Sequence, residues 1–449
     1  MNLFAHTPSF PRGVHPSDGK EFSANAPIEA LPTPKMVRIP LQQHLGAPAQ
    51  ATVKPRTEVV MGDPIGEAAG MISSPIHASL SGATAKVNPT PLPNGRRVDA
   101  IPIKVAEEQP LEGNELLSAM LGGEWPLEPP QDFKPEQVAE AAREAGIVGH
   151  GGAAFPSHVK LIRNHERPVD TILINGCECE PYLTADYRLM LESPGSVVAG
   201  AALARFATGA RRVVICVEDH VPDAAAALRT IADRCDIEVL ELQKKYPQGG
   251  EKSLALAVLG KTIPTGGLPL DIGAMILNVG TAAALARKVH RGFNLTHRVV
   301  CVTGRGITRP ANLLVPLGTP IRELIDFCGG LRPDTQRMVA GGPMMGFGFS
   351  DTSMPITKGN GGLTFLTRSD VEAQQETACL RCGRCVDVCP LNLVPSRMAT
   401  ATRSRNWELA EDYHIGACME CGSCAYACPA HLPLVQLIRV GKATLRSRS

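Results

Sequence analysis

The amino-acid sequence predicts a multidomain α/β protein, and three features of the chain support this. Short apolar alternations broken by turn residues fill residues 36–105 and indicate a small all-β unit. Strand-like and helical stretches alternate over residues 106–295, which is typical of a parallel sheet covered by helices. Two copies of one cysteine pattern, joined by helical spacers, lie within residues 370–449. A chain of 449 residues is long enough for several such units, each with its own core.

The first part of the chain is predicted to hold an arm and a β-barrel. Residues 1–35 are rich in Pro, Ser, Gly and His, a composition that predicts an extended arm. The segments Glu58–Gly66 and Ser74–Gly82 that follow resemble the barrel-sandwich fold of lipoyl and biotinyl carriers. No lysine lies between Lys54 and Lys86, so no modifiable residue stands at the hairpin that carriers use. We therefore interpret this unit as a scaffold rather than a swinging-arm domain.

The central part is predicted to hold two further folds. Within residues 106–295, a helix leads into a glycine-rich turn, and strands then alternate with helices, as in a parallel α/β domain. The predicted elements are a helix at 135–145, strands at 171–174, 212–217 and 237–240, and helices at 197–206 and 223–233. Residues 296–369 have strands near 298–302 and 312–315 and a helix at 321–327. This pattern predicts a compact β-grasp followed by a return segment.

Charge and hydropathy exclude several classes of protein. Lys plus Arg (45) balance Asp plus Glu (44), so no basic footprint for nucleic acid is present. No stretch reaches the roughly 18 apolar residues that a membrane-spanning helix needs. Free thiols and metal-ligand thiolates both favour a reducing compartment, so we expect a cytoplasmic protein.

The eight cysteines of the C-terminal unit form the most specific motif. The pattern C-x2-C-x2-C-x3-C-P occurs at Cys379–Pro390 and again at Cys418–Pro429, and it is typical of a protein with two [4Fe–4S] clusters. The fourth cysteine of each copy lies too far along the chain to close on its own cluster, and the proline after it turns the backbone away. The predicted ligand sets are therefore crossed: Cys379, Cys382, Cys385 and Cys428 for one cluster, and Cys418, Cys421, Cys424 and Cys389 for the other.

Two alternative uses of these cysteines fit less well. Structural zinc takes four ligands from pairs of C-x2-C and has no need of a third cysteine in both copies. A disulfide framework is typical of short secreted chains. We therefore expect a helical, ferredoxin-like domain that carries single electrons.

Two loops of the α/β domain indicate a nucleotide site. The glycine-rich segment Gly146–Pro156 precedes a helix expected near Ser157, and bare backbone amides before a helix favour a phosphate group. Asn175–Pro181, with two carboxylates, follows a predicted parallel strand at the end where α/β sheets bind ligands. Each loop alone is a weak signal, whereas the pair indicates a bound nucleotide.

These motifs resemble two related families. Gly146–Lys160 is similar to the flavin loop of the NADH-oxidising flavoprotein subunit of respiratory complex I, Asn175–Pro181 to its acidic loop, and Leu277–Thr281 to its asparagine loop. The order of all four units, with Tyr246–Lys252 and Gly341–Gly346, resembles the C subunit of the Rnf complex, an ion-translocating ferredoxin:NAD oxidoreductase. The resemblance extends over roughly residues 12–445.

The resemblance implies an FMN and an NAD(H) site in a complex-I-flavoprotein-like domain. The residues it implies are Gly146, Gly149, Gly151, Gly152 and Lys160 for the flavin phosphate and ring, Asn175 and Asn278 for the flavin, and Glu178, Glu180 and Glu251 for the nicotinamide side. Cys177 and Cys179 depart from the complex I loop and fit the Rnf family better. We interpret them as small buried thiols, together with Cys216, Cys235, Cys301 and Cys328.

The combination of cofactors suggests a mechanism. NADH gives up a pair of electrons as hydride, whereas a cluster accepts one electron, and a flavin can divide the pair. We therefore hypothesise electron transfer from NADH to FMN and then to the two clusters. This chemistry needs no acid, base or nucleophile, so no catalytic residue is predicted. We interpret His150 as a turn-packing or solvent-facing residue rather than a proton donor.

The resemblance also implies partners and a location. The expected partners are the membrane subunits of an Rnf complex, ferredoxin or flavodoxin, and NADH, at the cytoplasmic face of the bacterial inner membrane. One alternative is an electron-relay and docking module that does not itself oxidise NADH. Another is the cobalamin reductase of microcompartments, which shares the flavoprotein, β-grasp and two-cluster parts but lacks a barrel sandwich.

Overall fold

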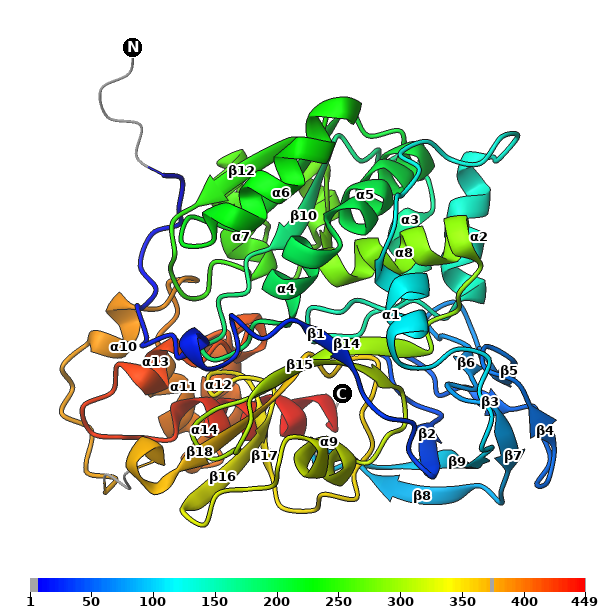
Figure 1. Cartoon of the computed structure of the whole chain (residues 1–449). Helices are drawn as coiled ribbons and strands as arrows, with labels where there is room; N and C mark the ends of the chain where they lie inside the picture. The colour runs from blue at the N-terminus through cyan, green and yellow to red at the C-terminus, as the bar shows by residue number, and fades with distance from the viewer. Residues whose placement is uncertain (1–6, 372–374, 449) are drawn as a thin grey trace.

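The computed structural model describes residues 7–371 and 375–448 and confirms the predicted fold class (Figure 1). A β-rich N-terminal unit lies at one end of the molecule, and a parallel α/β unit lies above it. A mixed sheet occupies the middle, and the helical C-terminal unit lies at the opposite end. The boundaries between the predicted domains stay predictions.

Two antiparallel sheets form the β-rich unit. One sheet has the order β2-β9-β7-β4, with β8 also paired to β9, and the other has the order β3-β5-β6. Inward-facing side chains of β2 and β9 make the core, where Val37 and Ile103 are fully buried. The strands are β2 (Met36–Pro40), β3 (Gln50–Ala51), β4 (Glu58–Val59), β5 (Pro64–Glu67), β6 (Ile76–His77), β7 (Gly82–Thr84), β8 (Asn88–Pro91) and β9 (Arg97–Val105).

The α/β unit has a parallel sheet of order β12-β11-β10-β13. Its strands read as continuous apolar runs because helices cover both faces: Ile172 and Ile174 pack with residues of α5 and α8, whereas Leu173 packs with α7. The strands are β10 (Thr171–Gly176), β11 (Arg212–Glu218), β12 (Glu238–Leu242) and β13 (Ala274–Asn278). The helices are α1 (Gly113–Leu121), α2 (Pro135–Glu144), α3 (Ser157–Leu161), α4 (Ala185–Glu192), α5 (Pro194–Thr208), α6 (Pro222–Ala232), η2 (Asp233–Cys235), α7 (Glu251–Leu259), η3 (Pro269–Ile272) and α8 (Val279–Arg291).

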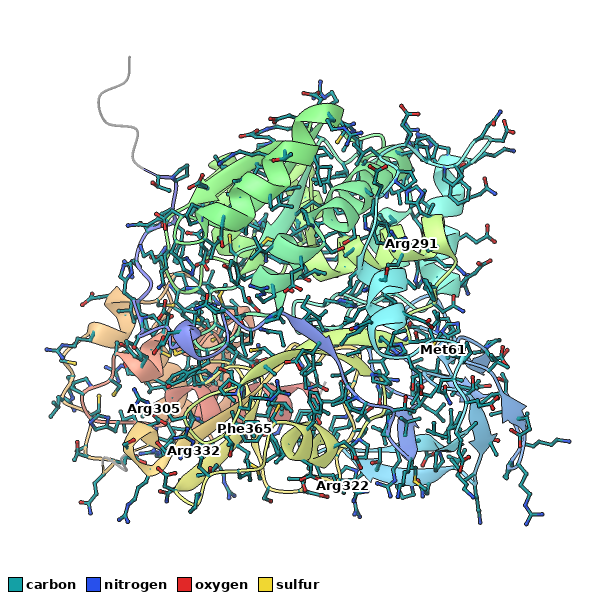
Figure 2. The ribbon with its side chains drawn as sticks, in the orientation of Figure 1. Met61, Arg291, Arg305, Arg322, Arg332 and Phe365 are labelled. Carbon is teal, nitrogen blue, oxygen red and sulfur yellow. The ribbon has the colours of Figure 1, made fainter. Side chains whose placement is uncertain are left out.

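The mixed sheet has the order β1-β15-β14-β18-β16-β17. Phe365 on β18 is fully buried in its core, whereas the labelled Arg322 and Arg332 lie at the outside (Figure 2). The elements are η1 (Lys20–Phe22), β1 (Ile28–Ala30), β14 (His297–Thr303), β15 (Ala311–Pro316), α9 (Ile321–Phe327), β16 (Thr335–Ala340), β17 (Phe347–Phe349), β18 (Gly362–Thr367) and η4 (Arg368–Val371).

The N-terminal arm joins the units to one another. Its strand β1 pairs in parallel with β15, with Ile28 opposite Asn312, and so forms an edge of the mixed sheet. Further towards the N-terminus, Val14 exchanges two backbone hydrogen bonds with Tyr246, of 2.9 and 3.0 Å. The amide of Gly13 donates to the carbonyl of Val388 in the C-terminal unit at 3.1 Å. The arm thus contacts three units of the molecule.

The C-terminal unit is helical, as the spacing of its residues predicts. Its two cysteine loops match in structure: α10 and α13 each follow a glycine with positive φ, Gly383 (80°) and Gly422 (86°). A residue with a side chain would be strained at either position. The helices are α10 (Arg384–Asp387), α11 (Pro395–Arg403), α12 (Trp407–Asp412), η5 (Ile415–Ala417), α13 (Ser423–Tyr426) and α14 (Leu434–Arg446).

Candidate functional site

The two predicted flavin-contacting asparagines lie side by side at the carboxyl edge of the parallel sheet. Asn175 ends β10 and Asn278 ends β13, and the two are paired in the strand register. Asn175 donates to the carbonyl of Gly249 at 2.8 Å. Asn278 accepts from the amide of Gly280 at 2.8 Å and so caps the N-terminus of α8. Parallel α/β sheets bind ligands at this edge, so both side chains stand where a nucleotide is expected.

The middle of the glycine loop is open beside this edge. Gly152 has a φ of 102°, and a Cβ atom added there would meet no atom within 4 Å. A Cβ atom at Gly151 would face the Cβ of Asn278 at 3.8 Å, and one at Gly149 would lie 3.7 Å from Phe155. Bare amides next to the N-terminus of a 13-residue helix, α8, suit an anionic phosphate. The residues present therefore fit the phosphate end of FMN.

The start of the glycine loop instead packs against the β-rich unit. Gly146 has a φ of 67°, and a Cβ atom there would lie 2.6 Å from the carbonyl oxygen of Pro75 and 2.7 Å from Nζ of Lys358. Lys358 is 1% exposed and donates to Gly146 (2.7 Å), Pro75 (2.8 Å) and Ser74 (3.2 Å). Gly146 thus anchors the loop, and Lys358 is a supporting residue that the sequence analysis missed.

His150 is a buried member of the loop. Its amide donates to the hydroxyl of Thr281 at 2.9 Å, and its carbonyl accepts from Arg298 at 2.9 Å. Burial lowers the pKa of its imidazole well below the usual range, and the positive charge of Arg298 adds to this shift. The side chain is 6% exposed, so of the two alternatives in the sequence interpretation the turn-packing role fits and the solvent-facing role is wrong.

The two carboxylates of the acidic loop bind backbone amides of the protein itself. Glu178 accepts from Asp186 (3.2 Å) and Tyr187 (3.1 Å) at the start of α4. Glu180 accepts from Met344 (3.2 Å) and Met345 (2.7 Å) in the mixed-sheet unit. Burial raises the pKa of Glu178, and it raises that of Glu180 to about 7. Both side chains thus shape the site, and a direct contact with the nicotinamide stays a prediction.

Lys160 and Glu251 form the more accessible part of the site. Their side chains make an ion pair of 2.9 Å and are 28% and 49% exposed. Lys160 also donates to the carbonyl of Ile276 on β13 at 3.0 Å. This pair borders the same sheet edge as the asparagines, where an ammonium group favours an anionic ligand.

Two further charged residues of the site were not predicted from the sequence. Lys20, from the N-terminal arm, is 9% exposed and donates to the carbonyls of Glu178 (2.7 Å), Glu180 (3.3 Å) and Leu183 (2.5 Å). Glu218, at the end of β11, is 2% exposed, and burial raises its pKa to about 7, although Lys20 opposes the shift. Lys20 therefore holds the acidic loop and places a positive charge among buried carboxyls.

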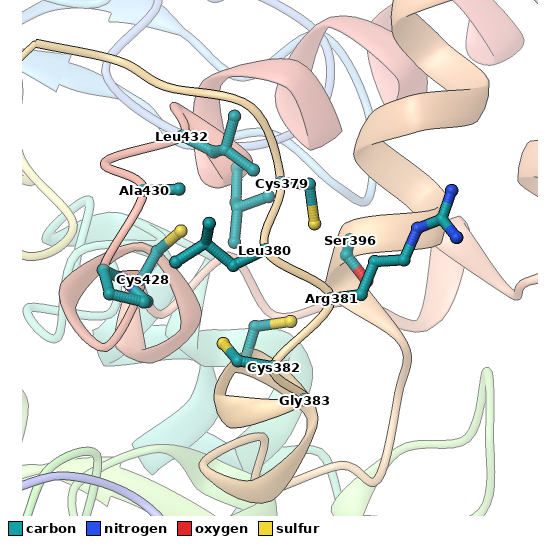
Figure 3. Close-up of a pocket in the computed structure, with 12 residues that line it drawn as sticks. Cys379, Leu380, Arg381, Cys382, Gly383, Ser396, Cys428, Ala430 and Leu432 are labelled. Atoms are coloured by element: carbon teal, nitrogen blue, oxygen red, sulfur yellow. The ribbon is translucent and has the colours of Figure 1, made fainter.

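One group of cysteines lines a pocket in the C-terminal unit (Figure 3). The cysteines of this group are Cys379, Cys382, Cys385 and Cys428. They are the four ligands predicted for the first cluster. Cys379 and Cys382 are exposed, so this pocket opens towards solvent.

The second group is buried more deeply. Cys421, Cys424 and Cys389 are 7–8% exposed. Burial raises the pKa of the Cys424 thiol, and the neighbouring Cys421, Cys418, Cys389 and Cys385 add to this shift. Cys385 belongs to the first group, so the two cysteine groups lie next to each other. No cysteine of the described residues forms a disulfide, and no group of three side chains among them is arranged to hold a single metal ion. Each predicted set supplies four cysteine thiols, the number of protein ligands that one [4Fe–4S] cluster takes.

The flavin-site loops and the second cysteine group meet at Tyr246. Its hydroxyl donates to the carbonyl of Cys421 at 2.5 Å, and its ring is 2% exposed. Tyr246, Cys421 and the partly buried Cys179 belong to one apolar cluster. Cys179 accepts from the amide of Gly249, which Asn175 also contacts through the Gly249 carbonyl. Packed protein atoms therefore connect the two candidate sites.

The remaining cysteines have structural positions. Cys177, Cys216, Cys301 and Cys328 are buried, as the sequence interpretation expects, whereas Cys235 is half-buried and packs at the margin of the core. Cys179 is half-buried and not a fully buried thiol. It lies between the acidic loop and the C-terminal unit.

The fold and the two sites define a class: a flavin and iron–sulfur oxidoreductase of the complex I flavoprotein type. Residues 142–287 match the model of the Nuo51 FMN-binding domain, and residues 375–432 match that of a 4Fe-4S dicluster domain. Residues 8–108 match the RnfC barrel sandwich hybrid domain, and residues 299–348 match the SLBB domain.

Similar proteins show the family. The C subunit of the proton-translocating ferredoxin:NAD(+) oxidoreductase complex of Clostridium ljungdahlii is 41% identical, over 98% of this chain and 94% of that protein. The C subunit of the Na(+)-translocating complex of Acetobacterium woodii is 39% identical, over 97% and 96%. This chain belongs to the family of the C subunits of Rnf-type ferredoxin:NAD oxidoreductases. The family assignment and the barrel-sandwich match favour this interpretation over cobalamin reductase.

Solved structures show the same fold at low sequence identity. An NAD+-reducing [NiFe]-hydrogenase chain matches with a TM-score of 0.51 and 18% identity, over 72% of this chain and 63% of that chain, less than two thirds of its length. No helix in the described part of the chain has the length and apolar character needed to cross a bilayer.

Proposed function

We propose that this protein is the peripheral electron-input subunit of a membrane-bound, ion-translocating oxidoreductase, and that it oxidises NADH. FMN bound at the sheet edge would take hydride from NADH, and the two [4Fe–4S] clusters would carry the electrons singly. The open glycine loop at Gly151 and Gly152 and the N-terminus of α8 would hold the flavin phosphate. Asn175 and Asn278 would orient the ring, and Lys160 with Glu251 would border the entry of the nucleotide.

The contact of Tyr246 with Cys421 is the observation that carries this proposal. It brings the loops of the flavin site against the cysteine group formed by Cys418, Cys421, Cys424 and Cys389. An electron-transfer chain needs such short, packed connections between its centres. The hydrogen bond of 2.5 Å is buried, so this contact lies inside the packed protein.

Rapid mixing of the reconstituted, FMN-loaded chain with NADH under argon tests the proposal. We expect the flavin absorbance to bleach first and the cluster absorbance to fall afterwards. Lys160→Ala should reduce flavin content or slow the first phase, because it removes the ammonium group at the sheet edge. Lys86→Ala, an exposed lysine of the β-rich unit, is the matched control and should behave as wild type. If both the flavin content and the first phase were unchanged in Lys160→Ala, the assigned pocket would be contradicted.

A relay module without its own NADH oxidation is the second candidate. Its support is that Glu178 and Glu180 are already bound by backbone amides and so are not free for a nucleotide. An anaerobic NADH titration separates the two. The relay candidate predicts that flavin and clusters stay oxidised at excess NADH, although dithionite reduces them.

We infer the partners and location from the family. The membrane subunits of an Rnf-type complex would hold the chain at the cytoplasmic face, and ferredoxin or flavodoxin would exchange electrons with the complex. Co-purification with membrane subunits, and release from membranes without detergent, would support peripheral attachment. Extraction only with detergent would contradict it.

A further inference from the structure

A small cavity lies near the C-terminal end of α8, whose N-terminal end borders the glycine loop. Its volume is about 10 Å³, and three polar side chains, Arg287, Asn294 and His297, line it together with apolar groups such as Met120 and Phe293. The space is enough for one water-sized or monatomic occupant. Figure 2 labels Arg291, which lies at the same end of α8.

Within the part of the chain that the structure describes, the guanidinium of Arg287 has no counterion. The residue is 6% exposed, and no described group accepts a hydrogen bond from its side chain or forms an ion pair with it. Burial and the neighbouring cation Arg291 together lower its pKa to about 10. A buried charge without a partner costs several kcal/mol. The other buried arginine of this region, Arg298, instead donates to the carbonyls of Lys358 and His150.

His297 presents a second unpaired polar atom to the cavity. It is 2% exposed, and its Nε2 atom has no hydrogen-bond partner among the described residues. Nδ1 lies 3.0 Å from the hydroxyl of Thr296. When this hydroxyl donates to Nδ1, the ring carries its hydrogen on Nε2 and offers a donor to the cavity. Burial, with Arg287 nearby, lowers the pKa of His297 to about 3, so the ring is neutral.

The third polar group of the lining does not supply negative charge. The amide nitrogen of Asn294 donates to the carbonyl of Gly62 at 2.9 Å, and its oxygen accepts from Lys288 at 3.0 Å. The cavity therefore has a cation and a neutral donor, with no carboxylate in its lining.

We propose that this cavity binds one small monatomic anion of the chloride class. The anion would accept hydrogen bonds from the guanidinium of Arg287 and from Nε2 of His297, and so would neutralise the buried charge. It would join α8 to β14, because Arg287 lies on the helix and His297 begins the strand. The volume excludes phosphate, sulfate and carboxylates. The proposal does not depend on the flavin or on the clusters.

Diffraction with bromide tests the site directly. Crystals of the cofactor-loaded full chain would be grown with bromide in place of chloride and measured at the bromine absorption edge. We expect an anomalous peak between Arg287 and His297. A water molecule at this position without anomalous signal would overturn the proposal.

Thermal unfolding provides a second test in solution. Replacing chloride with gluconate should lower the melting temperature of the wild type by about 2–4 °C, because bound anion stabilises only the folded state. Arg287→Met, which keeps the length of the side chain, should lose this dependence on halide. Arg143→Met removes an exposed arginine of α2 and should keep it. A full halide effect in Arg287→Met would overturn the proposal even if both variants fold.

Discussion

Replacing Glu218 with glutamine tests the electrostatics of the flavin site. Its side chain is buried, and no described group donates a hydrogen bond to its Oε1 atom. Burial raises the pKa of this carboxyl from 4.5 to about 7; Lys20 opposes the shift and Glu178 adds to it. Since the folded pKa lies above the unfolded one, the contribution of Glu218 to stability is complete below pH 4.5. It is lost as pH rises through 7. At 1.36 kcal/mol per pKa unit, ionised Glu218 costs the folded protein about 3 kcal/mol.

Glu218→Gln removes this ionisation. We expect the variant to unfold at a temperature similar to that of the wild type near pH 5, and at a higher temperature at pH 8, with the gap opening mainly between these values. The assay is thermal unfolding of the cofactor-loaded chain under argon across this pH range. Glu140→Gln, at an exposed position of α2, is the control and should show no such change. A difference between Glu218→Gln and wild type that does not vary with pH would refute the reasoning.

Three further outcomes test the supporting residues. Cys428→Ser and Cys379→Ser should abolish the EPR signal of the same cluster, and Cys389→Ser should abolish the signal of the other cluster. If Cys428→Ser instead removed the signal that Cys389→Ser removes, the crossed ligand sets would be contradicted. Lys358→Met removes the hydrogen-bond donor of the carbonyl oxygens of Pro75 and Gly146. Each unsatisfied oxygen should destabilise the folded protein by about 1–3 kcal/mol. FMN retention on gel filtration should fall, and equal retention would count against the anchoring of the loop. Lys20→Met should raise the pKa of Glu180, because the charge of Lys20 lowers that pKa. The pH dependence of flavin reduction should therefore shift to higher pH, and an unchanged pH dependence would contradict this role of Lys20.

Local patterns were sufficient to predict most of the fold. The buried run at Thr171–Gly176 has the apolar character that a strand covered on both faces requires, and it forms β10. The helix predicted at 321–327 is α9. The arm was harder to predict, because β1 (Ile28–Ala30) has only three residues, too few for an alternation to be recognised. Its strand character comes from pairing with β15, which no short window of sequence contains.

The site was predictable where a motif carries the chemistry. Asn175 could be placed at the sheet edge because it follows a predicted parallel strand, whereas Asn278 was assigned only through the family resemblance, and its strand β13 was not predicted. Lys20 and Lys358 could not be placed, since each acts on carbonyl groups of residues far away in the chain. A lysine amid apolar or turn residues is the only local signal of such a role. The engagement of Glu180 by Met344 and Met345 was hidden for the same reason.

The pairing of β1 with β15 has a consequence for how the protein is made. Residues near the beginning of the chain must wait for Asn312 to leave the ribosome before their edge strand can form. The partners of Lys20 in the acidic loop, by contrast, are synthesised well before Asn312, so that part of the arm can bind earlier than β1. The mixed sheet is thus completed late in synthesis, by a strand that was made early.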